Sequence, residues 1–388
     1  MSGAPGRGTV VLLAFACDPE AGSEPGAGWV AVEAATQVAS SVIVFTRADS
    51  GTTLSERAAR LPADVEIVRI RTPFDTRGPV YVRYAAWIAL AAAELRRRVK
   101  RTDSIDVVHH VTYASDWMPS PLAFVGGLKS RIRRTVWGPV GGATYPDRGL
   151  LRIFPARFRL SELVRGAATR TVRAFALPLH RRNVDVAVAM NDDSARAMKR
   201  FRRVEMSPNA VIDAALLPDA PEQREDVVVF AGRPLEWKGI RLALKARELA
   251  AEPWTLELYG ASAEEFAVFG TLSGSVSVQG RVPRTELLKR LASAKALVLP
   301  SLHDSAAWIA AEAASLGTPV VCLDIGGVPA MAADSAVVVP SAPAVNLAER
   351  IALTLDALVS RPAETTPDHF LWGRDRYVEK LRGWYDLR

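Results

Sequence analysis

Short β-rich runs alternate with helical stretches along the chain, and this rhythm restricts the possible folds more than any other feature of the sequence. In the first half, the expected strands are Thr9–Cys17, Val42–Thr46, Val65–Ile70, Asp106–Val111, Thr135–Trp137 and Val184–Ala189. The expected helices there are Gly28–Ser40, Val80–Arg101, Asp116–Val125, Leu160–Arg182 and Asp193–Arg203. In the second half, the expected strands are Val227–Ala231, Thr255–Tyr259, Val276–Gln279, Ala296–Pro300, Pro319–Leu323 and Ala336–Val339. This alternation is typical of parallel, doubly wound sheets, so the sequence predicts an α/β fold.

A break in this rhythm divides the chain into two parts. The segment Asp213–Asp226 contains two prolines and five acidic residues, and it separates the two series of strands. The sequence therefore predicts two Rossmann-like domains, 1–213 and 214–367, with the ligand in a cleft between them. The last segment, 368–388, is expected to form an amphipathic helix rich in Trp and Tyr.

Composition and cysteine usage restrict the class of protein. With 388 residues, the chain is long enough for two hydrophobic cores. No apolar run reaches the ~20 residues of a membrane-spanning helix, and we interpret the apolar run near the N-terminus as a strand and not as a signal peptide. Cys17 and Cys322 lie in apolar strands of different halves, which predicts free thiols in a reducing compartment. We therefore expect a cytoplasmic location.

The segment Pro300–Val321 carries two carboxylates in a strand–turn–helix pattern. A buried strand is expected to end at Pro300, and a helix is expected over Ser305–Ser315. Asp304 then lies at the mouth of the helix, with Glu312 eight residues further on. Free N–H groups at a helix N-terminus bind anions, and carboxylates accept hydrogen bonds from sugar hydroxyls. The pattern fits a nucleotide-sugar site, although an N-cap aspartate followed by an exposed helical glutamate would explain it equally well.

This segment resembles the E-x7-E element of the family 4 retaining glycosyltransferases. Asp304 stands at the first Glu of that element and Glu312 at the second, while Ala306 and Ala307 replace its usual Phe-Gly. The resemblance implies that Glu312 binds the ribose hydroxyls of the nucleotide and that Asp304 faces the donor sugar. It also implies that the backbone amides of Ala306, Ala307 and Trp308 lie near the sugar and the phosphates.

A second segment, Val227–Gly239, resembles the strand–G-R-x-x-x-x-K-G element of the same family. Gly232 and Arg233 match its G-R, and Lys238 matches its basic residue before the last Gly. The resemblance implies that Arg233 and Lys238 neutralise the donor diphosphate, on which negative charge grows as the glycosidic bond breaks. An exposed loop followed by a lysine at a helix start is the structural alternative.

The resemblance also implies the fold, which in this family is named GT-B. This fold consists of two Rossmann-like, doubly wound parallel-sheet domains that face each other across a cleft, and its C-terminal helix crosses back to the first domain. A loop after a strand of the second domain, which includes Arg281 and Val282, resembles the loop that contacts the nucleobase through main-chain groups. The turn at Gly326-Gly327 lacks the acid of the family pattern, so we interpret it as structural.

Two features of the first domain are candidate parts of the site. The segment Cys17–Trp29 is glycine-rich without the G-x-G-x-x-G spacing, which argues against a dinucleotide cofactor. It resembles the family loop that faces the diphosphate, with Gly26 and Gly28 allowing close approach of the backbone. His109 and His110 lie near the end of the expected strand Asp106–Val111 and must therefore point to opposite faces of a sheet. His110 is the catalytic candidate, with His109 behind it, and a core histidine is the structural alternative.

The resemblance implies a retaining, front-face reaction in which the leaving phosphate helps to take the proton of the acceptor. No G-x-S-x-G, clustered Cys and His ligands or D-x-D pattern is present in the sequence. We therefore expect a metal-independent reaction without a cofactor. UDP is the expected nucleotide because it is the commonest one in the family.

Positive charge is concentrated in the first half of the chain. Residues 1–213 contain 31 Lys and Arg against 20 Asp and Glu, whereas the remainder contains 18 against 22. Within Leu150–Arg182, eight arginines stand against a single acid, Glu162. This segment is either a solvated helical face or a patch that contacts the inner face of the membrane, as expected for a lipid-linked acceptor. Binding of nucleic acid is disfavoured because no known module accompanies the charge.

The sequence is compatible with three chemical classes of acceptor. The acidic loop with Asp18, Glu20 and Glu24 suits a cationic small molecule such as an aminocyclitol, whereas the basic segment suits a lipid-linked acceptor or a glycan. A non-catalytic two-domain sugar-binding protein and a nucleotide-sugar epimerase of the same fold are the competing functions. The sequence leaves the donor sugar, the linkage and the oligomeric state undetermined.

Overall fold

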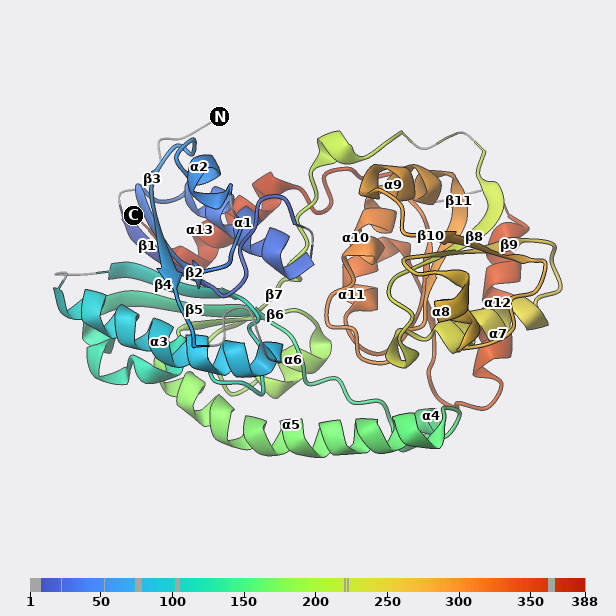
Figure 1. Ribbon diagram of the computed structural model, residues 1–388, viewed down its shortest axis with the longest axis horizontal. Helices are drawn as coiled ribbons and strands as arrows, with labels where there is room; N and C mark the ends of the chain where they lie inside the picture. Colours follow the sequence, from blue (N-terminus) through green and yellow to red (C-terminus); the bar gives the residue numbers. More distant parts are fainter. Residues whose placement is uncertain are drawn as a thin grey trace. The chain divides into compact units, whose positions relative to one another are not determined.

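The structure is a computed structural model that describes residues 8–21, 23–51, 53–73, 79–101, 105–219, 221, 223–361 and 367–387. The chain forms two compact units (Figure 1). Unit 1 comprises Met1–Ala143, Ala168–Val211 and Arg374–Arg388, and unit 2 comprises Thr144–Ala167 and Ile212–Gly373. This division differs from the predicted boundaries, because residues 144–167 belong to unit 2.

Unit 1 is built on a parallel sheet whose described strands follow the order β3-β2-β1-β4-β5-β6-β7. These strands are β1 (Thr9–Ala14), β2 (Ser41–Arg47), β3 (Asp64–Ile70), β4 (Ile105–Thr112), β5 (Ile132–Val140), β6 (Val186–Ala189) and β7 (Val204–Met206). The helices are α1 (Ser23–Ala35), α2 (Leu54–Ala58), α3 (Val80–Arg101), α6 (Asp192–Ala197), α13 (Arg374–Tyr385) and the short η1 (Pro121–Phe124) and η2 (Gly126–Arg131). Helix α5 (Ala156–Asn183) begins in unit 2 and ends in unit 1.

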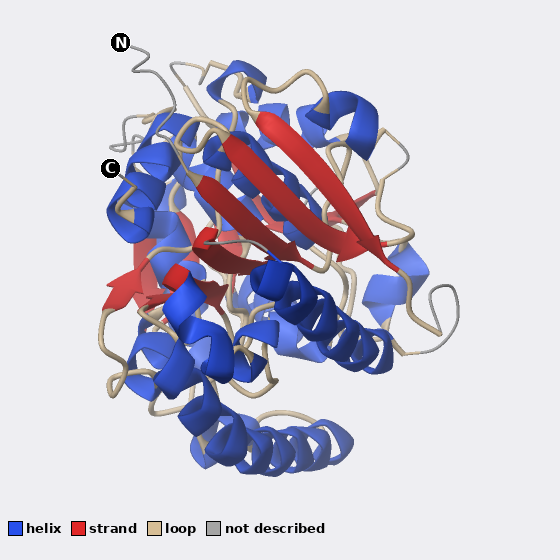
Figure 2. Ribbon diagram, turned by 90° about the vertical axis from the view of Figure 1, so that its left-hand side faces the viewer, coloured by secondary structure: helices blue, strands red, loops and turns tan. Residues whose placement is uncertain are grey.

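Both faces of this sheet are covered by helices, as the continuous apolar strands require. Alternate residues of β1 point to opposite faces, so Val10 and Leu12 pack with α1 and α13, whereas Val11 and Leu13 pack with α3. Figure 1 shows α1 and α13 on one side of the strands and α3 on the other, and Figure 2 shows helices on both sides of a sheet. The C-terminal helix α13 is therefore part of the core of unit 1, where Tyr385 is fully buried.

Unit 2 repeats this design with the described strand order β10-β9-β8-β11-β12-β13, again with parallel neighbours. Its strands are β8 (Glu225–Ala231), β9 (Thr255–Tyr259), β10 (Val276–Gly280), β11 (Ala294–Leu299), β12 (Val320–Leu323) and β13 (Ala336–Val339). Its helices are α4 (Arg148–Leu151), α7 (Ile240–Leu249), α8 (Ala263–Ala267), α9 (Arg284–Ser293), α10 (Trp308–Ser315), α11 (Val328–Ala332), α12 (Leu347–Val359) and the short η3 (Ala214–Leu216), η4 (Glu236–Lys238) and η5 (Ala333–Ser335).

The predicted α/β class with two doubly wound parallel sheets is confirmed, but several local predictions were wrong. Helix α1 begins at Ser23 and not at Gly28, and α6 ends at Ala197 and not at Arg203. The expected helix Asp116–Val125 is absent from the described chain, where only η1 forms, because Pro119 and Pro121 lack the N–H groups that an α-helix needs. Strand β7 was missed because it has only three residues.

Further sequence predictions concern the cysteines and the membrane. Cys17 and Cys322 are free thiols, as predicted, and both are buried. Among the described residues, no helix has the length and apolar character needed to cross a membrane.

The strand order reverses direction at one point in each sheet, between β1 and β4 in unit 1 and between β8 and β11 in unit 2. Loops that leave the carboxyl ends of two such strands diverge to opposite faces and leave a crevice at the sheet edge. In unit 2, the loops that follow β8 and β11 are the two segments singled out by the sequence. The topology therefore brings both segments to the same edge of one sheet.

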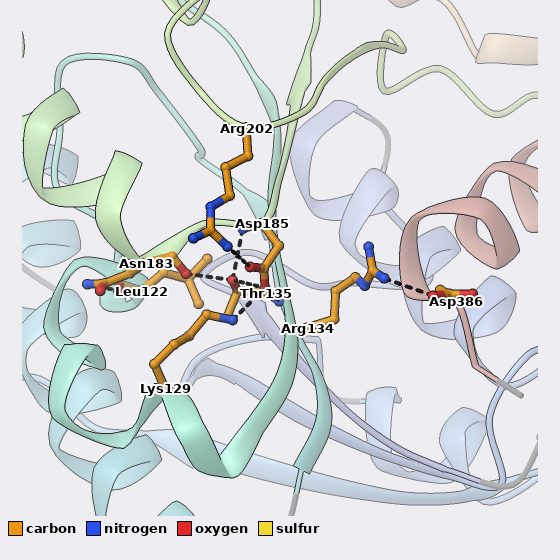
Figure 3. A network of polar contacts seen from close by, with 8 residues as sticks. All are labelled: Leu122, Lys129, Arg134, Thr135, Asn183, Asp185, Arg202 and Asp386. Carbon is orange, nitrogen blue, oxygen red and sulfur yellow. Dashed lines mark hydrogen bonds and ion pairs between the residues drawn. The ribbon is translucent and has the colours of Figure 1, made fainter.

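A half-buried aspartate connects the end of α5 to the sheet of unit 1 (Figure 3). Asp185 accepts hydrogen bonds from the backbone N–H of Thr135 at 2.8 Å, from the Thr135 hydroxyl at 2.9 Å and from Lys129 Nζ at 2.5 Å. Arg202 lies 3.8 Å from the same carboxylate. Burial raises the pKa of Asp185, but the hydrogen bonds from Lys129 and Thr135 outweigh it and leave the pKa below its usual value.

Replacement of Asp185 by Ala should therefore lower the free energy of unfolding at pH 7 by about 2 kcal/mol, because buried donors lose their acceptor. Since folding lowers the pKa of this carboxyl, its contribution is present above the unfolded pKa of about 4 and is lost as the pH falls through the folded value. Urea denaturation at pH 7 and pH 3 measures both effects. Glu205→Ala, which removes an exposed partner of Arg203, is the control, and equal losses in the two variants would contradict this role.

Candidate functional site

The loop after β8 approaches the loop after β11 closely. Gly239 has a φ of 77°, and a Cβ atom at this position would lie 2.1 Å from the carbonyl oxygen of Pro300. Only glycine allows the two backbones to pack in this way. The backbone N–H of Leu302 donates to the carbonyl oxygen of Trp237 at 2.8 Å and joins the loops further.

This approach brings together the basic residue of one segment and the first acid of the other. Lys238 and Asp304 form an ion pair, and their side chains are only 18% and 11% exposed. The ammonium of Lys238 also lies 4.7 Å from the centroid of the Trp237 ring. Arg233, in contrast, is exposed, and its side chain forms no ion pair or hydrogen bond with any described residue. It follows Gly232 at the carboxyl end of β8 and is free to meet an anion.

Helix α10 begins at Trp308, three residues later than predicted, and Ala307 is its N-cap. Asp304 is therefore not an N-cap but lies in the preceding loop, where its carbonyl oxygen accepts from the N–H of Gly327 at 2.6 Å. This bond supports the interpretation of Gly326-Gly327 as a structural turn. Ala306 and Ala307 belong to the loop between Asp304 and the helix.

Glu312 is buried in α10, with only 6% of its surface exposed, which contradicts its alternative interpretation as an exposed helical residue. Its Oε1 accepts from Arg284 Nε at 2.7 Å. Burial raises the pKa of Glu312, and the positive charge of Arg284 opposes this effect only in part. Arg284 is the first residue of α9 and 41% exposed, so the pair is open to solvent on the arginine side.

The loop before α9 contains the predicted nucleobase contacts. Arg281 is exposed and donates from Nε to the carbonyl oxygen of Gly260 at 3.2 Å, and Val282 is half-buried. Arg284 and His303 were missed by the sequence analysis. Their places in the sequence could have identified both residues, because Arg284 lies three residues after Arg281 and His303 directly precedes Asp304.

In unit 1, Gly26 and Gly28 lie in the first turns of α1 and not in a flexible loop. A Cβ atom at Gly28 would lie 2.2 Å from the carbonyl oxygen of Ala16, and one at Gly26 would lie 2.3 Å from that of Ala21. The glycines therefore allow α1 to pack against the end of β1. Their predicted contact with a diphosphate stays a prediction.

His109 and His110 point to opposite faces of the sheet, as predicted, and both rings are fully buried. His109 contacts the carbonyl oxygen of Gly138 at 2.7 Å and the hydroxyl of Tyr385 at 2.8 Å. His110 Nε2 lies 3.2 Å from the Tyr84 hydroxyl. Burial lowers the pKa of His109 to about 4 and that of His110 to about 3, so both imidazoles are neutral at pH 7. This placement fits core histidines, and the catalytic role of His110 stays a prediction.

Comparison with known proteins agrees with this geometry. Residues 225–357 match the family model described as glycosyl transferases group 1. The D-inositol 3-phosphate glycosyltransferase of Streptomyces bingchenggensis is 30% identical over 221 residues, which cover 49% of this chain and 48% of the relative. The enzyme of the same name from Segniliparus rotundus is 32% identical over 122 residues, which cover 28% of this chain and 27% of the relative. The chain thus spans about half, or less, of the length of these curated relatives.

Solved structures extend the similarity to almost the whole chain. Sucrose-phosphate synthase from Thermosynechococcus elongatus is 15% identical with a TM-score of 0.59, and the match covers 98% of both chains. TarM is 9% identical with a TM-score of 0.60, over 98% of this chain and 99% of the other. Anabaena Alr3699/HepE in complex with UDP and glucose is 15% identical with a TM-score of 0.55, over 96% of this chain and 95% of the other. At such low identity these structures establish the fold alone.

Together, the comparisons confirm the predicted resemblance to the glycosyltransferases and the GT-B fold. The segment that matches the family model of group 1 glycosyl transferases includes the loops after β8 and β11. The paired charges of Lys238 and Asp304 therefore lie within the matched segment.

Replacement of Glu312 by Gln should raise the free energy of unfolding at pH 7 by about 1 kcal/mol, the usual size of the gain when a costly functional group is removed. Because folding raises the pKa of this carboxyl, the wild type loses stability as the pH rises from the unfolded pKa of about 4.3 through the folded value. The two proteins should therefore be equally stable near pH 4 and differ at pH 7. Urea denaturation at both pH values tests this, and a variant less stable than the wild type at pH 7 would refute it.

Proposed function

We propose that this chain is a retaining glycosyltransferase that moves a sugar from a nucleoside diphosphate sugar to a hydroxyl group of its acceptor. One observation carries this proposal: Lys238 and Asp304 meet where the loops after β8 and β11 join, inside the segment that matches the glycosyltransferase family. A cation beside a carboxylate at this edge suits a ligand that has both phosphates and hydroxyls.

Arg233 and Lys238 are the residues that stabilise the leaving group. As the bond between the anomeric carbon and the diphosphate oxygen breaks, negative charge accumulates on the diphosphate. Two cations beside the diphosphate lower the energy of that state more than the energy of the bound donor. The acceptor oxygen attacks from the same face, and its proton passes to the leaving phosphate, so the reaction needs neither a protein nucleophile nor a metal. Asp304 would then face the donor sugar.

The nucleotide is held by the second pair. The carboxylate of Glu312 accepts hydrogen bonds from the ribose hydroxyls, and the charge of Arg284 opposes the rise in its pKa that burial causes. The main-chain groups near Arg281 and Val282 contact the base, and the amides of Ala306, Ala307 and Trp308 lie near the sugar and phosphates. UDP is the preferred nucleotide in this proposal, which is supported by the crystal structures of Anabaena Alr3699/HepE with UDP and with UDP-glucose.

The acceptor belongs to unit 1 in this proposal and is a small molecule or glycan. Similarity to the D-inositol 3-phosphate glycosyltransferases and to AviGT4, which is involved in avilamycin A biosynthesis, supports a small acceptor. The roles that the family resemblance implies for Gly26, Gly28 and His110 are part of this proposal. Two free buried thiols fit the reducing cytoplasm, which is also where we propose the enzyme acts.

A second partner, an anionic membrane surface, is favoured by the exposed face of α5. Leu160, Val164 and Phe175 are 64%, 60% and 74% exposed, although each is a large apolar side chain. Arg181 and Arg182, near the end of the same helix, are also exposed. An amphipathic helix with exposed apolar and basic side chains binds at the surface of anionic lipid. A lipid-linked acceptor would fit this mode of binding.

Replacement of Lys238 or Arg233 by Ala should lower turnover of UDP-glucose by roughly 100-fold or more, because each variant removes charge that stabilises the leaving diphosphate. The measurement is UDP release with D-inositol 3-phosphate and a panel of other acceptors, in excess EDTA, with GDP-, ADP- and TDP-sugars as competing donors. Lys289→Ala removes an exposed lysine of α9 and serves as the control. Near-normal activity in both variants, or no binding of any nucleotide to the wild type in calorimetry, would disprove the donor site and favour a non-catalytic protein.

Charge reversal of Arg181 and Arg182 to Glu should weaken binding to phosphatidylglycerol vesicles by roughly 100-fold, since each basic residue near the surface contributes about 1 kcal/mol. Co-sedimentation with vesicles measures this effect, and phosphatidylcholine vesicles are the control. If the wild type stays in the supernatant with both lipids, α5 is simply a solvated helix.

A further inference from the structure

The first half of α5 places an acidic side chain against the loop after β11. Glu162 is the one acid among the arginines of Leu150–Arg182, and it is buried, with 7% of its surface exposed. Its Oε1 lies 3.3 Å from Nε2 of His303, the residue directly before Asp304. Both residues belong to unit 2. An acid from outside the two sequence segments thus reaches the site that they form.

The carboxylate of Glu162 is held ionised at this position. Arg165 donates from Nε to both carboxylate oxygens, at 3.1 and 3.0 Å, and from Nη2 to Oε2 at 2.7 Å. Burial raises the pKa of Glu162, but the neighbouring imidazole of His303 and the hydrogen bonds from Arg165 outweigh it and bring the pKa to about 2. The guanidinium of Arg165 in turn lies 5.7 Å from the ring of Tyr145. The carboxylate is therefore a fixed negative charge at any pH where the enzyme would work.

His303 connects Glu162 to the loop after β8, which contains Trp237 and Lys238. Its ring stacks on Trp237, with a centroid distance of 4.8 Å and an angle of 22° between the planes. The ammonium of Lys238 lies 4.7 Å from the same Trp237 ring and pairs with Asp304. A continuous series of contacts therefore runs from Glu162 through His303 and Trp237 to Lys238.

We infer that Glu162 is a positioning residue for the donor site, and this inference rests on the proposed function. By holding the imidazole of His303, Glu162 keeps that ring flat against Trp237. The Trp237 ring then limits where the ammonium of Lys238 can lie beside Asp304. Lys238 is thereby aimed at the position of the diphosphate before the donor binds, which is the preorganisation that charge stabilisation in a transition state requires.

The test compares Glu162→Gln, which keeps the shape and removes the charge, with the wild type. Calorimetry measures the affinity for UDP, and UDP release measures kcat and KM for UDP-glucose in the assay that the wild type supports. We expect kcat to fall about 10-fold, because misplacement of a catalytic group by about 1 Å costs up to 100-fold. KM for the acceptor should stay unchanged. A role in folding alone would lower the melting temperature without this selective loss in kcat.

A double-mutant cycle with His303 separates this mechanism from general damage. His303→Phe keeps a flat ring for Trp237 but cannot contact Glu162, and we expect it to lower kcat as Glu162→Gln does. If Glu162 acts through His303, the kcat of the double variant should be no lower than that of the more impaired single variant. Glu248→Gln, which removes an exposed acid from α7 in the same unit, is the matched control and should retain full activity.

Two sets of results would overturn the inference. Unchanged kcat in Glu162→Gln, or losses that multiply in the double variant, would show that Glu162 does not act through His303. If Glu162→Gln fails to fold, His303→Phe decides alone, because full activity in that variant excludes transmission through His303. A wild type that binds no UDP, GDP, ADP or TDP would instead refute the proposed function itself, so the two failures are distinguishable.

Discussion

The geometry of the donor side depends on the close approach of two backbones at Gly239 and Pro300. Any side chain at Gly239 would collide with the carbonyl oxygen of Pro300, which lies 2.1 Å from the position of a Cβ atom. Without this approach, the hydrogen bond between Leu302 and Trp237 could not form. The pairing of Lys238 with Asp304 follows from the same contact, since each residue lies within four positions of it. Because Gly239 has no side chain, the two loops can approach each other and their charged groups can form a pair.

These charged groups are paired with one another. Each acid of the E-x7-E-like segment faces a cation from another loop: Asp304 faces Lys238, and Glu312 faces Arg284. Pairing holds the cations in position, so the proposed binding of a diphosphate would need little reorganisation. Burial of the Glu312 carboxylate is unfavourable for its charged form, and its pKa is therefore raised. One partly exposed arginine does not fully replace the water that the carboxylate loses. Such a cost is common where a site is built for binding and not for stability.

The sequence predicted most of the strands and the two parallel sheets, because these depend on apolar periodicity and on residue types at fixed spacing. It misplaced the start of α10 by three residues, since nothing local distinguishes Asp304 from an N-cap. It also read the glycines at 26 and 28 as loop residues, although they pack a helix against a strand. The opposite orientation of His109 and His110 followed from strand geometry, but their burial did not. Burial depends on residues such as Tyr84 and Tyr385, which are distant in sequence.

The Glu162–His303 contact shows most clearly why spacing alone was insufficient. The family model covers residues 225–357, so it includes His303 but neither Glu162 nor Arg165. In sequence, Glu162 is a single acid within an arginine-rich helix, where a surface ion pair is the simplest explanation. In the structure, its burial and its ion pair with Arg165 make it a fixed carboxylate beside the donor loops. A residue that contacts a sequence motif from another part of the chain cannot be identified from the pattern of the motif itself. It is found only when the chain is folded, because its role depends on which neighbour it contacts and not on where it stands in the sequence.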